Sequence, residues 1–440
     1  MIQIILVIAY TFLFLFLIRK MKFFSLENIQ PKYVSLVFVI KIIAGCCLGL
    51  IYTYYYTDRS TADTYKFFDD GKVLFHSLQQ NPLHFFEMLT GINSGSPELN
   101  VYYEKMNAWF NIDVLFNDNR TLIRLNAIFD CFSFGNYYVN VVFINFISFT
   151  GLIALFKMFQ TFQKNKSKEL FAGVMLLPSM LFWGSGLLKD GLLLFALGML
   201  LYSLHKIITS SHSRTNIWGF IFCLLLLTIT KLYVLIIIFP GIIAWYWSRK
   251  DVSKRKIVFK FTLSYLIYLI LAFNIGSAVD KYNVTDLIYF KQKNFYVIAE
   301  ANKANSVIEI TPVERNAWSI LKNSPEAVVR VLFRPTLPEA KSALILLAAI
   351  ENIIILLILL ICLISYRQSD IFRQPVFYFS VFFVLLMFTL IGLITPVMGA
   401  MVRYKVPALP FVMFVFIAVY DREKMRRFFK SPRSTVDSRQ

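Results

Sequence analysis

The sequence predicts an all-α fold: a polytopic transmembrane helical bundle of about 11 spans, some short or broken, with two outer loops that contain short helices. Composition is the first reason, because 58% of the 440 residues are hydrophobic and 16% are charged, whereas soluble domains have about 45–50% and about 25%. Apolar runs of roughly 20 residues, enough to cross ~30 Å of hydrocarbon, recur along the chain. The basic residues cluster between these runs, so the formal charge of +19 indicates membrane topology and no nucleic-acid partner.

Residues 1–54 contain the first two predicted spans, near 2–18 and 34–54. The loop that joins them should face the cytoplasm, because it carries four basic residues, Arg19, Lys20, Lys22 and Lys32. The N-terminus is then expected outside, and residues 55–136 form a first periplasmic loop.

The central spans are expected within residues 137–275. They are predicted near 137–159, 170–184, 187–204, 217–229, 232–247 and 257–275. For 217–247 we expect two short or broken helices that meet at Lys231 near the outer surface, because both flanks are basic and should share the cytoplasmic side. Pro240 and Gly241 supply a break in the second half. The alternative is one long tilted helix with Lys231 buried.

The second periplasmic loop is expected at 276–341, a polar stretch with charges of both signs. Residues 342–420 should hold the C-terminal spans, near 343–364, 375–395 and 406–420. The tail at 421–440 is predicted to be cytoplasmic, because it carries Arg422, Lys424, Arg426, Arg427 and Lys430.

A charged motif opens the first loop with four acidic residues, Asp58, Asp63, Asp69 and Asp70. Asp63, Phe67 and Asp70 recur at helical spacing and should share one face of a helix. Asp63 or Asp58 would act as a general base by accepting a proton from an acceptor hydroxyl, and Asp70 would contribute to substrate binding. The alternative is an N-terminal turn whose acids suit the helix dipole.

Lys189 and Asp190 follow a turn of small residues between two predicted spans. Lys189 would bind a lipid-linked phosphate, oriented by Asp190; the alternative is an interfacial lysine that snorkels beside a helix-start acid. Lys231, a charge within a span, is a further candidate for substrate binding. Glu351 lies in a later span and should have Lys231 or a neighbouring amide as its partner.

Further basic candidates lie toward the C-terminus. Arg330 and Arg334 are four residues apart on an amphipathic helix that Pro335 should end. Their guanidinium groups suit phosphate oxygens, and attraction to anionic lipid headgroups is the alternative. Arg403 should open the last span and bind an anionic substrate, and its alternative is interfacial anchoring together with Tyr404.

At these residues the chain resembles bacterial GT-C-type membrane glycosyltransferases and the related O-antigen or polysaccharide polymerases. The resemblance rests on the order of three short motifs. They are Ala62-Asp63-Thr64-Tyr65 with Asp69-Asp70, then Pro178 with Phe182-Trp183 and Lys189-Asp190, and finally Arg403-Tyr404-Lys405-Val406-Pro407-Ala408-Leu409-Pro410.

The resemblance implies an enzyme of the bacterial inner membrane. It would transfer a sugar or oligosaccharide from a polyprenyl-phosphate or polyprenyl-diphosphate carrier to a glycan or other acceptor at the periplasmic face. It further implies that a first-loop acid acts as the base or helps to hold a divalent metal, a role that falls on Asp63. The chain departs from the family pattern because it has no clean Asp-Glu or Asp-x-Asp pair.

Two other functions compete with this interpretation. A lipid-linked oligosaccharide flippase or other transporter would suit broken spans with a buried charge such as Lys231, although the long outer loops and the absence of an internal repeat argue against it. Composition also allows a non-enzymatic membrane subunit of an envelope complex. For the transferase, we expect the ionised side chains to gather around one periplasm-facing pocket.

Overall fold

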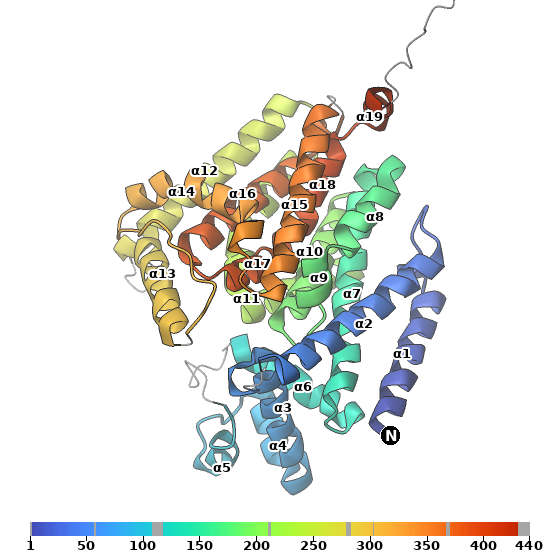
Figure 1. Ribbon diagram of the computed structural model, residues 1–440, viewed down its shortest axis with the longest axis vertical. Helices are drawn as coiled ribbons and strands as arrows, with labels where there is room; N and C mark the ends of the chain where they lie inside the picture. Colours follow the sequence, from blue (N-terminus) through green and yellow to red (C-terminus); the bar gives the residue numbers. More distant parts are fainter. Residues whose placement is uncertain are drawn as a thin grey trace, which may run out of the picture. The chain divides into compact units, whose positions relative to one another are not determined.

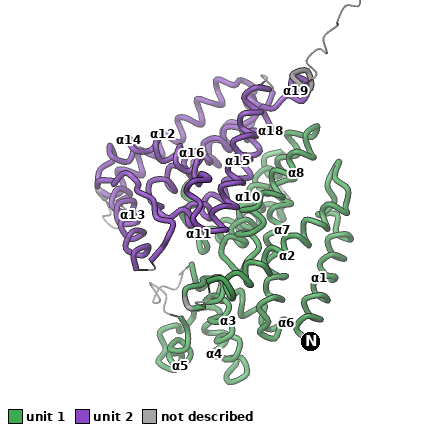
Figure 2. The backbone as a smooth tube through the Cα atoms, viewed as in Figure 1, with its two compact units in different colours: residues 1–239 green, residues 240–440 purple. Residues whose placement is uncertain are grey.

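The computed structural model describes residues 2–56, 59–107, 118–209, 213–278, 283–301, 303–366 and 370–429. These residues fold as helices joined by turns, and nine of the described helices are long and apolar enough to cross a membrane (Figure 1). The chain is therefore an all-helical, multi-pass membrane protein. Its internal contacts divide it into two compact units, Met1–Phe239 and Pro240–Gln440, which Figure 2 shows in green and purple.

Unit 1 contains the N-terminal helices and the first loop. Its α-helices are α1 (Ile2–Lys20), α2 (Pro31–Tyr54), α3 (Asp63–Gln80), α4 (Pro82–Thr90), α5 (Asn100–Tyr103), α6 (Asp118–Ser133), α7 (Tyr137–Phe162), α8 (Ser167–Met175), α9 (Pro178–Trp183) and α10 (Lys189–Thr209). The long helix α11 (Arg214–Ser248) begins in unit 1 and ends in unit 2.

Unit 2 contains the second loop and the C-terminal helices. Its α-helices are α12 (Lys254–Ala278), α13 (Val284–Ala301), α14 (Ala317–Phe333), α15 (Ala343–Ile364), α16 (Pro375–Ile394), α17 (Met398–Tyr404), α18 (Leu409–Val419) and α19 (Arg422–Phe429).

The prediction of about 11 spans differs from the nine candidate helices in two places. The expected span at 170–184 is divided into the short helices α8 and α9, because Leu177 is extended just before Pro178, which begins α9. The expected pair at 217–247 forms the single helix α11, which is interrupted where Lys231 has non-helical backbone angles (φ −149°, ψ 79°). The predicted break at Lys231 is thus present, and Lys231 is also buried, as the alternative interpretation expected. The break predicted at Pro240 and Gly241 is wrong, because α11 continues through both residues to Ser248.

Segments of unit 1 that were predicted to lie on the same side of the membrane share one end of the unit. The Tyr10 hydroxyl of α1 donates a hydrogen bond to the backbone oxygen of Phe132 in the first loop (2.9 Å). Near the other end of α7, Gln160 donates to the backbone oxygen of Glu27, which joins the two basic loops (2.6 Å). Figure 1 likewise shows α3, α4 and α6 near the start of α1. The cellular side of each end stays a prediction.

The core of unit 1 depends on a close contact between α7 and α10. Gly151 and Gly198 meet at this contact, and a methyl group on either would overlap backbone atoms of the other helix. Interiors with this packing density cannot absorb an added carbon without a backbone shift. The contact fixes α10, and α10 begins with the two charged residues Lys189 and Asp190.

Gly198→Ala should therefore lower the stability of the protein by roughly 1–3 kcal/mol or more, because backbone atoms and not flexible side chains must move. Thermal unfolding in detergent measures the change. Gly95→Ala is the matched control, since no atom lies within 4 Å of the added methyl group. Equal melting temperatures for the two variants would contradict the tight α7–α10 contact.

Candidate functional site

The acidic motif of the first loop lies at the start of α3. Asp63 is the first residue of this helix, and Phe67 and Asp70 are buried on the same face, which confirms the predicted helix and its shared face. Asp63 is half-buried. Asp58, the other predicted base, lies outside the described residues.

Two carboxylates of this motif hold the loop together. Asp70 accepts hydrogen bonds from the backbone and side-chain nitrogens of Asn107 (2.9 and 2.8 Å). Asp69 receives two bonds from the Arg59 guanidinium (2.8 and 2.6 Å), a planar two-point pairing that restricts both side chains. Asp70 is thus placed as a loop anchor, and its role in substrate binding stays a prediction.

Two ion pairs join the start of α10 to α6 and α11. Lys189 Nζ lies 2.6 Å from Asp118 Oδ2, and the Lys189 and Asp118 side chains are 11% and 54% exposed. Lys231 Nζ lies 2.9 Å from Asp190 Oδ1, and these side chains are 8% and 1% exposed. Asp63 and Lys231 also act electrostatically on Lys189. We call Asp63, Asp118, Lys189, Asp190 and Lys231 the charge cluster.

The charge cluster is built around the interruption of α11. Thr121, one turn after Asp118 in α6, donates its hydroxyl proton to the backbone oxygen of Ile229 (2.9 Å), two residues before Lys231. Backbone groups released by a helix break within a membrane need such partners, because lipid offers none. Helix α6 therefore bonds the broken helix through Thr121 and the start of α10 through Asp118.

A buried polar network anchors α6 against α7. Asp130 Oδ1 accepts hydrogen bonds from Asn140 Nδ2 (2.8 Å) and Ser133 Oγ (3.2 Å), and Asn140 also donates to Asn126 (3.2 Å). The second carboxylate oxygen, Asp130 Oδ2, has no hydrogen-bond partner among the described residues. Burial in this setting raises the pKa of Asp130 to about 6, because charging a desolvated oxygen is costly.

The charge cluster divides into a buried and an accessible part. Asp190 and Lys231 are nearly closed to solvent, so they compensate each other and fix the geometry of the two helices. Asp118 is 54% exposed and Asp63 is half-buried, while Lys189 is 11% exposed and nearly as enclosed as Lys231. Two carboxylates and one lysine carry a net negative charge, so an anionic group would have to replace Asp118 at Lys189, and a carboxylate that can accept a proton lies in the same region.

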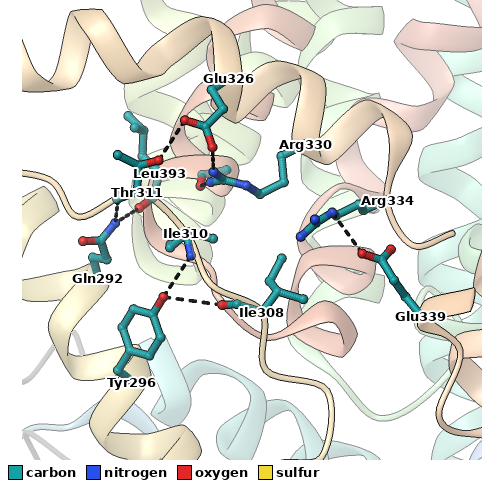
Figure 3. Close-up of polar contacts among 11 residues, drawn as sticks. Gln292, Tyr296, Ile308, Ile310, Thr311, Glu326, Arg330, Arg334, Glu339 and Leu393 are labelled. Atoms are coloured by element: carbon teal, nitrogen blue, oxygen red, sulfur yellow. Dashed lines mark hydrogen bonds and ion pairs between the residues drawn. The ribbon is translucent and has the colours of Figure 1, made fainter.

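Unit 2 carries a second group of charged residues, on α14 and just after it. Arg330 of α14 donates to the backbone oxygen of Gly392 (2.9 Å) and pairs with Glu326, and its side chain is 8% exposed. Arg334 follows the end of α14 and pairs with Glu339 (3.1 Å), with 36% of its side chain exposed. Figure 3 shows both arginines, whose guanidinium groups lie on the same side of the extended segment 308–311.

The motif at the start of the last span adds a lysine that the sequence analysis did not single out. Lys405 is buried, donates to Asn352 Oδ1 (3.1 Å), and is attracted by Glu351. Lys405 is thus a charged group that interacts with Glu351 within unit 2, and the expected partnership of Glu351 with Lys231 stays a prediction. Arg403 lies in the last turn of α17, and the Tyr404 ring is 6.0 Å from Phe295.

The predicted site residues therefore fall into two groups. Unit 1 brings together Asp63, Lys189, Asp190 and Lys231. Unit 2 holds Arg330, Arg334, Arg403 and Tyr404. The expected gathering of all of them around one pocket stays a prediction. Sequence reasoning missed Asp118 and Thr121, whose only signal was their place at the start of a short polar helix.

A metal centre has no ready-made ligand set in the described part of the chain. No group of three or more histidine, cysteine, aspartate or glutamate side chains there could hold a metal ion. The divalent metal implied by the family resemblance stays a prediction.

The stability of the protein should depend on pH through Asp130. Its folded-state pKa of about 6 lies above the ordinary value of 3.8, so its favourable contribution is complete below about pH 4 and is lost as pH rises through about 6. Asp130→Asn should remove this loss, giving a stability gain of roughly 3 kcal/mol at pH 7.5 and only about 1 kcal/mol at pH 4.5. Melting curves of both proteins across this range measure the difference, and a gap that does not vary with pH would contradict the assignment.

No family model, curated protein or solved structure matches the chain. The charge cluster and the arginine-containing group of unit 2 are therefore the features that indicate a function.

Proposed function

We propose that the protein is a membrane glycosyltransferase or polysaccharide polymerase that uses a sugar donor linked to polyprenyl phosphate or diphosphate. The observation that carries the proposal is the charge cluster, in which the half-buried Asp63 acts on Lys189 at the loop end of unit 1. Ionisable groups buried within a membrane bundle, such as Asp190 and Lys231, are costly to place and often mark functional sites. The proposal requires this end of unit 1 to lie at the level of the lipid headgroups, where a phosphorylated lipid presents its phosphate.

The proposed chemistry needs one base and one cationic group. A hydroxyl oxygen of the acceptor forms a bond to the anomeric carbon of the donor sugar, and Asp63 accepts the hydroxyl proton. The bond between the anomeric carbon and the phosphate oxygen breaks, and its electron pair leaves with the lipid phosphate. Lys189 stabilises the charge that develops on this phosphate. Asp118 forms an ion pair with Lys189 before the donor binds. The ion pair between Asp190 and Lys231 holds the start of α10 in place.

The arginines of unit 2 support binding of an anionic group by that unit. Arg334 is the more accessible of the two, because Arg330 is committed to Gly392 and Glu326. We propose that Arg334 binds phosphate oxygens or anionic lipid headgroups and that Arg330 mainly holds α14 on α16. Arg403 and Tyr404 complete the proposed binding residues of unit 2. The proposed location is the bacterial inner membrane, with the N-terminus outside and the C-terminus inside.

A second candidate function is transport of a lipid-linked oligosaccharide. One observation favours it: the interruption of α11 carries a buried ion pair to the start of another helix, an arrangement that transporters use near their binding sites. Purified protein in detergent with a labelled polyprenyl-linked sugar and candidate acceptors separates the two functions. Product formed without a sealed membrane supports the transferase, whereas movement across proteoliposomes without product supports the transporter.

Asp63→Asn should reduce sugar transfer in this assay by about 10²–10⁴-fold, because the amide cannot accept the acceptor proton. The variant keeps the size and polarity of the side chain, so its melting temperature should stay close to that of the unchanged protein. Asp286→Asn is the matched control, since Asp286 also lies in the first turn of a loop helix, α13. Full transfer by Asp63→Asn would remove the base from the proposal.

Lys189→Met should weaken use of the donor by roughly 10²-fold in kcat/KM, because the cation that stabilises the leaving phosphate is removed. Steady-state rates at increasing donor concentration measure this effect. Lys105→Met, which alters an exposed lysine elsewhere in the first loop, should leave the rates unchanged. If both variants behave alike, Lys189 has no part in donor binding.

A further inference from the structure

Lys41 is a lysine of α2 that is fully buried within unit 1. Its Nζ donates hydrogen bonds to the backbone oxygen of Gly184 (3.0 Å) and to Ser185 Oγ (3.1 Å). No carboxylate of the described chain lies within ion-pair distance of this nitrogen. A buried amine without a carboxylate partner costs free energy within a membrane. The two oxygen atoms that accept its hydrogen bonds are therefore the partners that stabilise it.

Both partners belong to the non-helical turn 184–188, between α9 and α10. Ser148 Oγ donates a second bond to the Gly184 oxygen (2.8 Å), and Asn145 Nδ2 donates to the Ser185 oxygen (2.8 Å). A side chain at Gly45 would overlap the Ser185 oxygen, so α2 approaches the turn with its backbone. Helices α2 and α7 therefore hold the turn by four recorded hydrogen bonds.

The turn leads directly into the charge cluster. Lys189 and Asp190 are the first two residues of α10, and they reach Asp118 and Lys231 in different helices. A shift of the turn would move both charged groups together. If the atoms of either pair separated by an ångström or two, the hydrogen-bonded contact would be lost, and the Coulomb attraction would fall by roughly a quarter to two-fifths.

We infer that Lys41 is a positioning residue, which fixes the 184–188 turn so that Lys189 and Asp190 meet their partners. The effect on sugar transfer rests on the proposed function, whereas the effect on the ion pair does not. A lysine that only filled space would contribute to stability without changing how strongly Asp190 interacts with Lys231.

A double-mutant cycle on melting temperature tests this inference. Asp190→Asn should lower the melting temperature of the unchanged protein, because Lys231 loses its carboxylate while buried. If Lys41 positions the turn, the pair is displaced in a Lys41→Met protein, and the same Asp190→Asn change should cause a smaller shift. A shift of equal size in both backgrounds would overturn the inference.

Lys157→Met provides the matched control background. Lys157 is a half-buried lysine of α7, and its Nζ lies 4.9 Å from the centre of the Phe23 ring, with no contact to the turn among those recorded. Asp190→Asn should keep its full effect there. Ser148→Ala is the milder second variant, since it removes one hydrogen bond to Gly184 and leaves Lys41 in place. If Lys41→Met yields no folded protein, the Asp190→Asn melting cycle is measured in the Ser148→Ala background instead.

Sugar transfer gives an independent measurement. If the unchanged protein transfers the labelled sugar, Lys41→Met should lower kcat by roughly 10–100-fold, as expected for a small displacement of reacting groups, and Lys157→Met should not. Absence of transfer by the unchanged protein would reject the proposed function, while the melting cycle would still decide the role of Lys41. An unchanged kcat together with an additive cycle would reject the positioning role.

Discussion

The structure depends on a single constraint: backbone groups released where a buried helix breaks must find hydrogen-bond partners inside the protein, because lipid supplies none. Unit 1 meets this constraint twice. Lys41, Ser148 and Asn145 bond the turn before α10, and Thr121 bonds the end of the first half of α11. The breaks are therefore stable features, and charged side chains can be placed beside them.

Unit 2 solves the same problem with other side chains. At the end of α16, Arg330 donates to the Gly392 oxygen and Gln292 donates to the Leu393 oxygen (2.7 Å). The extended segment 306–313 then pairs with the link to α17, where the Ile308 nitrogen donates to the Pro396 oxygen (2.8 Å). A basic side chain in such a protein can thus donate hydrogen bonds to backbone oxygens. An arginine near a helix end therefore does not by itself indicate a phosphate site.

The buried ion pair of unit 1 is better explained as specifying how α10 and α11 pack together than as adding to the stability of the protein. Removing Lys231 and Asp190 from water costs free energy that their attraction repays only in good geometry. The pair joins α10 to the interruption of α11 (2.9 Å), and so defines which residues of the two helices meet. The position of Lys189 follows from this arrangement, since it precedes Asp190 in the same first turn.

The sequence alone determined the membrane class, most of the spans, the helix that begins at Asp63 and the break at Lys231, because hydrophobicity and helix termini are local properties. It did not reveal that Pro178 divides one predicted span, since a proline can also lie within a membrane helix. Only the tertiary structure decided the partners of the charges: Asp118 for Lys189, Asp190 for Lys231 and the 184–188 turn for Lys41. These contacts join residues up to 144 positions apart, and no local pattern encodes which distant helices pack together.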